Sequence, residues 1–198
     1  MGLDFDSKNG QTPLDDDEKE GLLIKSITNR GELDEFEQHN IEKALLWLRR
    51  KKISAEEILS EKFVRELHLR MYDAVWKWAG TFRQTNKNIG IEKHNISTAL
   101  KQLLDDCRYW ILNQSYPPEE IIIQFKHRLV YIHCFSNGNG RHSRLIADVM
   151  MEKIFQRPPF TWGAASLSGR GELRTFYINA LKKADAGDYK DLLAFAKS

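Results

Sequence analysis

The most informative stretch of the chain reads HCFSNGNGRHSR, at residues 133–144. Apolar residues at helical spacing lead into it from residue 121 and continue after it to residue 150, so we expect a turn between two helices. The glycines of this turn allow positive φ angles and a close approach to a ligand. The free N–H groups at the start of the second helix then make a ready anion site.

The side chains of this stretch suit a polyphosphate and a base. Arg141 and Arg144 would lie on neighbouring faces of the first helical turn, where their guanidinium groups match phosphate oxygens and stay charged at neutral pH. His133 is the candidate base, because a neutral imidazole can take up a proton near neutral pH. Each feature alone is common in structural turns. A structural turn needs neither the histidine nor the arginines, so together they indicate a functional site.

The same stretch resembles the signature of the Fic family, H-x-F-x-[D/E]-G-N-G-R-x-x-R, at all but one of its defined positions. Residues 67–83 resemble the helix and the W-A-G-x-x-R segment that lead into the family's flap. Residues 177–189 resemble its closing helices, so the resemblance covers most of the chain. Residues 27–41 are most similar to the subgroup called mobile mystery protein B.

The resemblance implies an all-α fold: a Fic-like orthogonal helical bundle with one small β-hairpin flap. Local patterns agree with it. Asn29, Ser54 and Ser60 each precede an amphipathic stretch as helix caps, the last of which is expected to start a helix that runs through Trp76. The helical period is lost between residues 80 and 97, where asparagines and Gly90 supply turn residues for a hairpin.

Composition and charge, together with the family resemblance, divide the chain into three expected regions. Residues 1–20 form an acidic arm that is too polar to order itself, residues 21–54 a helical segment that packs on the core, and residues 55–198 the Fic domain. The full 198 residues, 41% hydrophobic and 29% charged, fit a soluble globular protein. The net charge of +2 gives no indication of direct nucleic-acid binding.

Membrane insertion and secretion are not expected. No apolar run is long enough to span a bilayer, and the N-terminus lacks the basic and apolar regions of a secretory signal. Cys107 and Cys134 do not make a disulfide framework, so a reducing cytoplasm is the expected location. Cys134 is interpreted as a small loop hydrophobe and not as a nucleophile.

The resemblance also implies a substrate, ATP, and a role for each residue of the site. His133 is implied to be the base that accepts the proton of a target hydroxyl. The residues implied to bind the nucleotide are Gly138, Asn139, Gly140, Arg141, Arg144 and Tyr177. The residues implied to dock a protein target by strand addition are the flap residues Asn88, Ile89, Gly90 and Ile91.

Position 137 is where the sequence departs from the family pattern. The family has an acidic residue there that carries Mg²⁺ on the phosphates, whereas this chain has Asn137. An amide oxygen can ligate Mg²⁺, but it contributes no negative charge. Mg²⁺ is therefore the expected cofactor and Asn137 its candidate metal ligand, with activity that is weak, selective for another metal, or lost.

Three functions are consistent with these features. The first is a Fic-type adenylyltransferase that moves AMP from ATP to a Ser, Thr or Tyr hydroxyl of a target protein. The second is Doc-like transfer of the γ-phosphate from a nucleotide bound in reverse, although the intact Arg144 argues against it. The third is a catalytically weak nucleotide-binding regulator linked to mobile elements, which Asn137 supports; a DNA-binding protein from the same gene pair would be its partner.

Glu32 has two interpretations. With Thr28 it fits part of the family's inhibitory motif, S/T-x-x-x-E-G/N, whose glutamate pairs with the second arginine of the signature. Leu33 stands where that motif has Gly or Asn. Alternatively, Glu32 is the third residue of a capping box that begins at Asn29.

Overall fold

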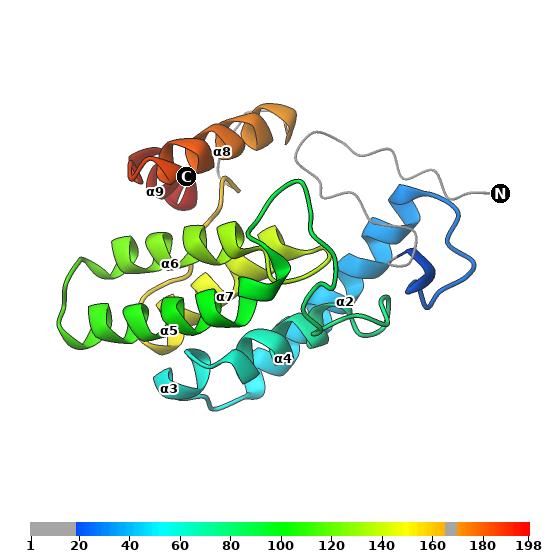
Figure 1. Ribbon diagram of the computed structural model, residues 1–198, viewed down its shortest axis with the longest axis horizontal. Coiled ribbons are helices and arrows are strands. Elements are labelled where there is room, and N and C mark those ends of the chain that lie inside the picture. Colours follow the sequence, from blue (N-terminus) through cyan, green and yellow to red (C-terminus); the bar gives the residue numbers. More distant parts are fainter. Residues whose placement is uncertain (1–18, 165–169) are drawn as a thin grey trace.

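The computed structural model describes residues 19–164 and 170–198, which are mostly helical (Figure 1). The all-α class is confirmed. The predicted arm at residues 1–20 lies, except for its last two residues, outside the described residues. The named elements are α2 (Arg30–Arg50), α3 (Ala55–Ile58), α4 (Glu61–Tyr72), η1 (Lys93–Asn95), α5 (Ile96–Leu112), α6 (Pro118–Ile132), α7 (Asn139–Lys153), α8 (Arg170–Asp185) and α9 (Lys190–Lys197).

The first helices begin where the sequence predicted because polar side chains cap them. The side-chain oxygens of Asn29, Ser54 and Ser60 accept hydrogen bonds of 3.0, 3.2 and 3.1 Å from backbone N–H groups three residues further on. Each bond satisfies a donor that has no acceptor within the helix.

Helix α4 ends at Tyr72, earlier than the predicted end at Trp76. Residues 75–77 instead exchange backbone hydrogen bonds of 2.9 and 2.8 Å with residues 21–23. They form an isolated antiparallel bridge between Leu22 and Trp76. Tertiary pairing with the N-terminal segment therefore takes the backbone groups that a longer helix would have used.

The helices pack around two clusters of buried side chains. In Figure 1, α2 lies along α4, and α8 and α9 pair above α6. Helix α6 packs against both α5 and α7. The larger cluster fills the space between α2, α4, α5, α6 and α7. The smaller cluster joins Ile123 of α6 to Tyr177 of α8 and to Leu192 and Phe195 of α9. None of the described helices is both long and apolar enough to cross a membrane.

The flap, which we define as residues 81–92, is a loop; the prediction of a two-stranded hairpin was wrong. Side chains bind backbone groups that a β-ladder would need. The guanidinium of Arg83 donates to the carbonyl oxygens of Thr85, at 2.8 Å, and of Ile91. The amide oxygen of Asn86 accepts from the N–H of Lys93 at 2.9 Å. The flap thus folds back on itself without strand pairing.

Asn40 fixes α2 to the end of α4. Its buried side chain donates to the carbonyl of Arg70 at 3.0 Å and to Asp73 at 3.1 Å, and accepts from the N–H of Ala74 at 2.9 Å. Asn40→Ala leaves these groups unpaired, so we expect the free energy of unfolding to fall by about 1–3 kcal/mol in urea denaturation.

Gln38→Ala, on the exposed face of the same helix, is the matched control for this prediction. We expect it to change the free energy of unfolding by no more than about 0.5 kcal/mol. Equal losses in the two variants would show that the Asn40 contacts do not stabilise the packing of α2 on α4.

Candidate functional site

The predicted turn lies between Ile132, where α6 ends, and Asn139, where α7 begins. His133 and Gly138 both adopt left-handed backbone angles, with φ of 56° and 77°. At Gly138 a Cβ atom would come within 2.5 Å of the Tyr72 ring, so this position requires glycine. The expectation of a positive φ at Gly140 was wrong, because Gly140 belongs to the first turn of α7. A Cβ at Gly140 would meet no atom within 4 Å.

Asn139 holds the turn together through its buried side chain. Its amide nitrogen donates to the carbonyl of Phe135 at 2.7 Å, and its amide oxygen accepts from the N–H of the same residue at 2.9 Å. The sequence had suggested phosphate binding for Asn139. In this structure its side chain is occupied by the turn, while its backbone N–H belongs to the free donors at the start of α7.

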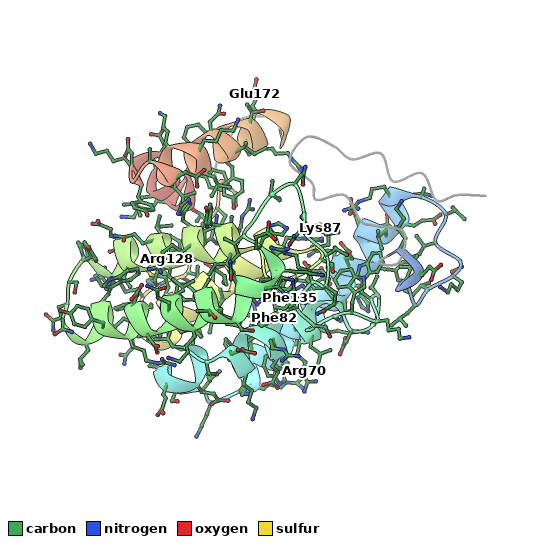
Figure 2. The ribbon with its side chains drawn as sticks, in the orientation of Figure 1. Arg70, Phe82, Lys87, Arg128, Phe135 and Glu172 are labelled. Atoms are coloured by element: carbon green, nitrogen blue, oxygen red, sulfur yellow. The ribbon has the colours of Figure 1, made fainter. Side chains whose placement is uncertain are left out.

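His68 fastens the turn to α4, a role that the sequence analysis missed. Its Nδ1 accepts from the N–H of Gly80 at 3.0 Å, so Nε2 carries the proton and donates to the carbonyl of Asn137 at 3.1 Å. Burial lowers the pKa of His68 well below its usual value and keeps this tautomer neutral. The ring also stacks on Phe135, with centroids 3.7 Å apart. Figure 2 shows Phe135 beside Phe82 in the same interior region.

His133 is buried, yet its side chain borders a cavity. Burial, with a smaller contribution from Arg83, lowers the pKa of His133 to about 4. The imidazole is therefore neutral at physiological pH and able to accept a proton, although it is a weaker base than the sequence analysis assumed. Arg83 also donates from Nε to the carbonyl of His133 at 2.6 Å, which ties the flap to this residue.

The four predicted docking residues of the flap are not equivalent. Ile89 and Gly90 line the cavity. Gly90 has a φ of 89°, and a Cβ there would lie 2.5 Å from the Cβ of His133, so the flap touches the candidate base. Asn88 is exposed, and the carbonyl of Ile91 is bound by Arg83. Asn88 and Ile91 do not line the cavity.

The cavity has a volume of about 780 Å³ and lies between the turn, α6 and α8. Small-molecule sites commonly have this size. The structure brings every predicted turn and nucleotide residue to its wall: His133, Asn137, Gly138, Asn139, Gly140, Arg141, Arg144 and Tyr177. It adds residues that the sequence analysis had not assigned to a site, among them Asp34, Trp162, Arg174 and Asp185.

The two arginines of the turn differ in their surroundings. Arg141 forms an ion pair of 2.5 Å with Glu37 of α2, a buried carboxylate that also accepts from the indole N–H of Trp76 at 2.7 Å. Arg144 has no carboxylate within ion-pair distance in the described part of the chain. Its guanidinium lies 4.5 Å from the ring centroid of Tyr177 and 5.5 Å from that of Phe195. Asp148, four residues further along α7, interacts with Arg144 only at longer range. Among the described residues, Arg144 is therefore a cation at the cavity without a direct ion pair.

Glu32 is found in the cap and not at Arg144. Its carboxylate accepts from the backbone N–H of Thr28 at 2.8 Å, and its own N–H donates to Asn29. The pairing of Glu32 with Arg144 that the inhibitory motif suggested is absent. Glu37, about one and a half turns further along α2, makes the carboxylate–arginine contact instead. The sequence pattern had given it no role. The signal that could have found it is its acidic character among the apolar positions of the buried helix face.

Asn137 offers little to a metal ion by itself. Its amide oxygen accepts from the N–H of Gly138 at 2.6 Å, which leaves one lone pair for another partner. Among residues 19–164 and 170–198, no three His, Cys, Asp or Glu side chains gather as a metal site. A Mg²⁺ ion would fit here only if phosphate oxygens and water supplied most of its ligands, as is usual for nucleotide-bound Mg²⁺.

Cys134, inside the turn, has a thiol of low reactivity. The side chain is buried, and burial raises the pKa of its thiol to about 12. A thiol that stays protonated is a poor nucleophile. Cys134 is therefore not a candidate nucleophile, and His133 and the two arginines remain the candidate functional side chains of the turn.

Comparisons with known proteins agree with this geometry. Residues 58–151 match the model of the Fic/DOC family. The chain is 22% identical over 174 residues to Protein adenylyltransferase Fic from Nematostella vectensis, covering 86% of this chain but only 39% of that relative. The match thus spans about two fifths of the relative's length.

Solved Fic structures share the fold. Fic-1 (residues 134–508) from C. elegans superposes with a TM-score of 0.69 at 23% identity, over 90% of this chain and 51% of that one. BepC with bound AMPPNP, from Bartonella tribocorum, gives a TM-score of 0.63 at 17% identity, over 91% and 95% of the two chains. Residues 58–151, which contain the turn and its histidine, thus match the Fic/DOC family, and solved Fic structures share the fold of the chain.

Proposed function

We propose that this domain transfers AMP from ATP to a hydroxyl group of a Ser, Thr or Tyr side chain on a target protein. The observation that carries the proposal is one cavity that holds a neutral His133 next to the free N–H groups of α7 and to Arg144, which has no carboxylate within ion-pair distance among the described residues. Such a site can bind a polyphosphate and deprotonate an incoming hydroxyl together. The distant relative named Protein adenylyltransferase Fic and the neighbour with bound AMPPNP support the choice of reaction and nucleotide.

The chemistry follows from these positions. The target hydroxyl gives its proton to the unprotonated nitrogen of His133, and its oxygen attacks the α-phosphorus of ATP. The bond from the α-phosphorus to the bridging oxygen breaks, so pyrophosphate leaves and AMP remains as an ester on the target. Arg144 and the N–H groups of α7 would balance the phosphate charge. The exposed flap residues Asn88, Ile89 and Gly90 would accept the extended target segment.

Mg²⁺ would supply additional positive charge on the phosphates, with Asn137 as its protein ligand. Because an amide carries no charge, metal binding would depend mainly on the nucleotide. The uncharged side chain of Asn137 also favours one other candidate function, a nucleotide-binding regulator with little or no transfer activity. Mass spectrometry of the protein after incubation with ATP and Mg²⁺ separates the candidates, since an adenylyl adduct, a phosphoryl adduct and no adduct differ in mass.

His133→Ala is expected to abolish the adenylyl adduct and to leave ATP affinity within about threefold of wild type, because the base acts on the hydroxyl and contributes little to ground-state binding. Calorimetric ATP affinity and adduct formation are measured on the same preparations. His94→Ala, at an exposed histidine of η1 away from the cavity wall, is the control. Undiminished transfer by His133→Ala would remove His133 from the mechanism.

Glu37→Gln is expected to tighten ATP binding by about tenfold, a typical size for coupling between two sites. The amide keeps the shape that accepts the Trp76 indole N–H, while Arg141 loses the negative charge that competes with phosphate. Glu32→Gln, in the Thr28 cap, is the matched control and should leave the affinity unchanged. Weaker binding by Glu37→Gln would mean that Glu37 orients Arg141 toward the phosphates and does not compete with them.

Asn137→Asp is expected to lower the Mg²⁺ concentration for half-maximal adduct formation by about tenfold or more, since even groups that only support a metal ligand are worth about 10–100-fold. The two residues have nearly the same shape, so the change adds charge without altering the turn. The measurement is a Mg²⁺ titration at fixed ATP for both proteins. Superimposable curves would exclude position 137 as a metal ligand, and inactivity of both would favour the nucleotide-binding regulator.

A further inference from the structure

Lys126 lies fully buried beneath the cavity, with 0% of its surface exposed. Its Nζ hydrogen-bonds to the hydroxyl of Tyr177 and lies 4.3 Å from the centroid of that ring and 6.0 Å from that of Trp162. No Asp or Glu in the described part of the chain comes within ion-pair distance of it. A lysine that is buried without an anion is unusual, because desolvating an ammonium group costs several kcal/mol.

The charges nearest to Lys126 do not neutralise it. Arg144 of α7 is the charged group that acts on it, and the sign of that charge is the same. Asp148, also on α7, accepts from the indole N–H of Trp162 at 2.9 Å, and burial raises the pKa of Asp148 to about 6. Tyr177 of α8 contributes a hydroxyl whose pKa burial raises, so it stays uncharged at neutral pH.

The remaining charged groups around α6 pair with other residues. His127, the neighbour of Lys126, bonds to Asp185 of α8 at 2.8 Å. Asp106 of α5 bonds to Arg128 at 2.7 Å. Burial, with a smaller contribution from Arg144, therefore lowers the pKa of Lys126 well below its usual value.

We propose that Lys126 is a positioning residue of the anion site, neutral in the free protein and protonated by solvent when a polyphosphate binds Arg144. This inference rests on the proposed function, because it needs a polyphosphate in the cavity. A bound polyphosphate reverses the sign of the local charge, which favours the ammonium form. Tyr177 borders both the cavity and Lys126, so its hydroxyl offers a path for the proton. By linkage, proton uptake and anion binding strengthen each other equally.

The first test needs no nucleotide. A lysine neutral in the folded state but protonated when unfolded makes the unfolded state bind more protons, so stability rises with pH until the unfolded lysine also loses its proton near pH 10.4. We expect the melting temperature of Lys126→Met to exceed that of wild type near pH 7, and the difference to shrink toward pH 10. Lys182→Met, at an exposed position of α8, should show no such difference. If the difference in melting temperature between Lys126→Met and wild type did not change with pH, Lys126 would not be neutral in the folded protein.

The second test measures proton uptake during ATP binding by calorimetry in buffers of different ionisation enthalpy. Protons that ATP itself exchanges are the same for both proteins and cancel in the comparison. We expect wild type to take up close to one more proton than Lys126→Met, and its affinity for ATP to fall by up to about tenfold per pH unit above neutral, until it meets that of the variant. Lys182→Met should match wild type.

The outcomes separate this inference from the proposed function. Absence of ATP binding to wild type would reject the nucleotide site itself, whatever the state of Lys126. ATP binding with equal proton uptake in wild type and Lys126→Met would reject the proton linkage and leave the nucleotide site intact. ATP binding with the expected difference would support both.

Discussion

The hydrogen bonds of His68 set the geometry on which the rest of the site depends. The turn between α6 and α7 is buried, so each of its backbone polar groups needs a partner. A neutral imidazole with one donor and one acceptor nitrogen meets this need on two sides, because it receives the N–H of Gly80 and donates to the carbonyl of Asn137. A second proton on the ring would remove the acceptor for Gly80. The position of the turn, and with it the direction of α7 toward the cavity, therefore depends on keeping that ring neutral.

Around this fixed turn, three basic side chains, Arg141, Arg144 and Lys126, differ in the groups that compensate their charge. Arg141 has a buried carboxylate, Glu37, within 2.5 Å. Arg144 lies against aromatic rings instead, which stabilise a cation without carrying a negative charge. Lys126 also lies over the Tyr177 ring and, in the described part of the chain, has no carboxylate within ion-pair distance. An amine can release its proton where a guanidinium cannot. The choice of lysine or arginine at each position thus determines whether the site carries a permanent charge or one that responds to the ligand.

Local sequence patterns predicted the helices, the caps and the turn, because these depend on residues close together in the chain. Asn29, Ser54 and Ser60 each cap a helix through a backbone N–H three residues away. The patterns failed where distant residues compete for the same backbone groups. The asparagines of the flap predicted a hairpin, but the side chain of Arg83 binds the carbonyls that strands would have shared.

The residues of the candidate site also divide into those that local sequence could identify and those that depend on distant partners. The residues of the turn could be found because they are contiguous in sequence. Glu37, His68 and Lys126 could not, since each acts through a partner at least 51 positions away. The expectation of a positive φ at Gly140 was wrong for a different reason. Gly140 lies in the first turn of a helix, where a glycine has ordinary helical backbone angles. The structure shows instead that the space around its Cα is open.

The bond between Arg83 and the carbonyl of His133 has a mechanical consequence. The same guanidinium holds Thr85 and Ile91, so the flap and the base are linked through one rigid, buried group. The flap cannot lift or tilt as an independent lid without pulling on the backbone that carries the imidazole. Under the proposed function, a protein that docked on the flap would act on the alignment of the base as it bound, and a poorly fitting protein would misalign the group needed to modify it. Selection among targets would then depend on the connection between the two loops, separately from the contacts that either loop made with the target.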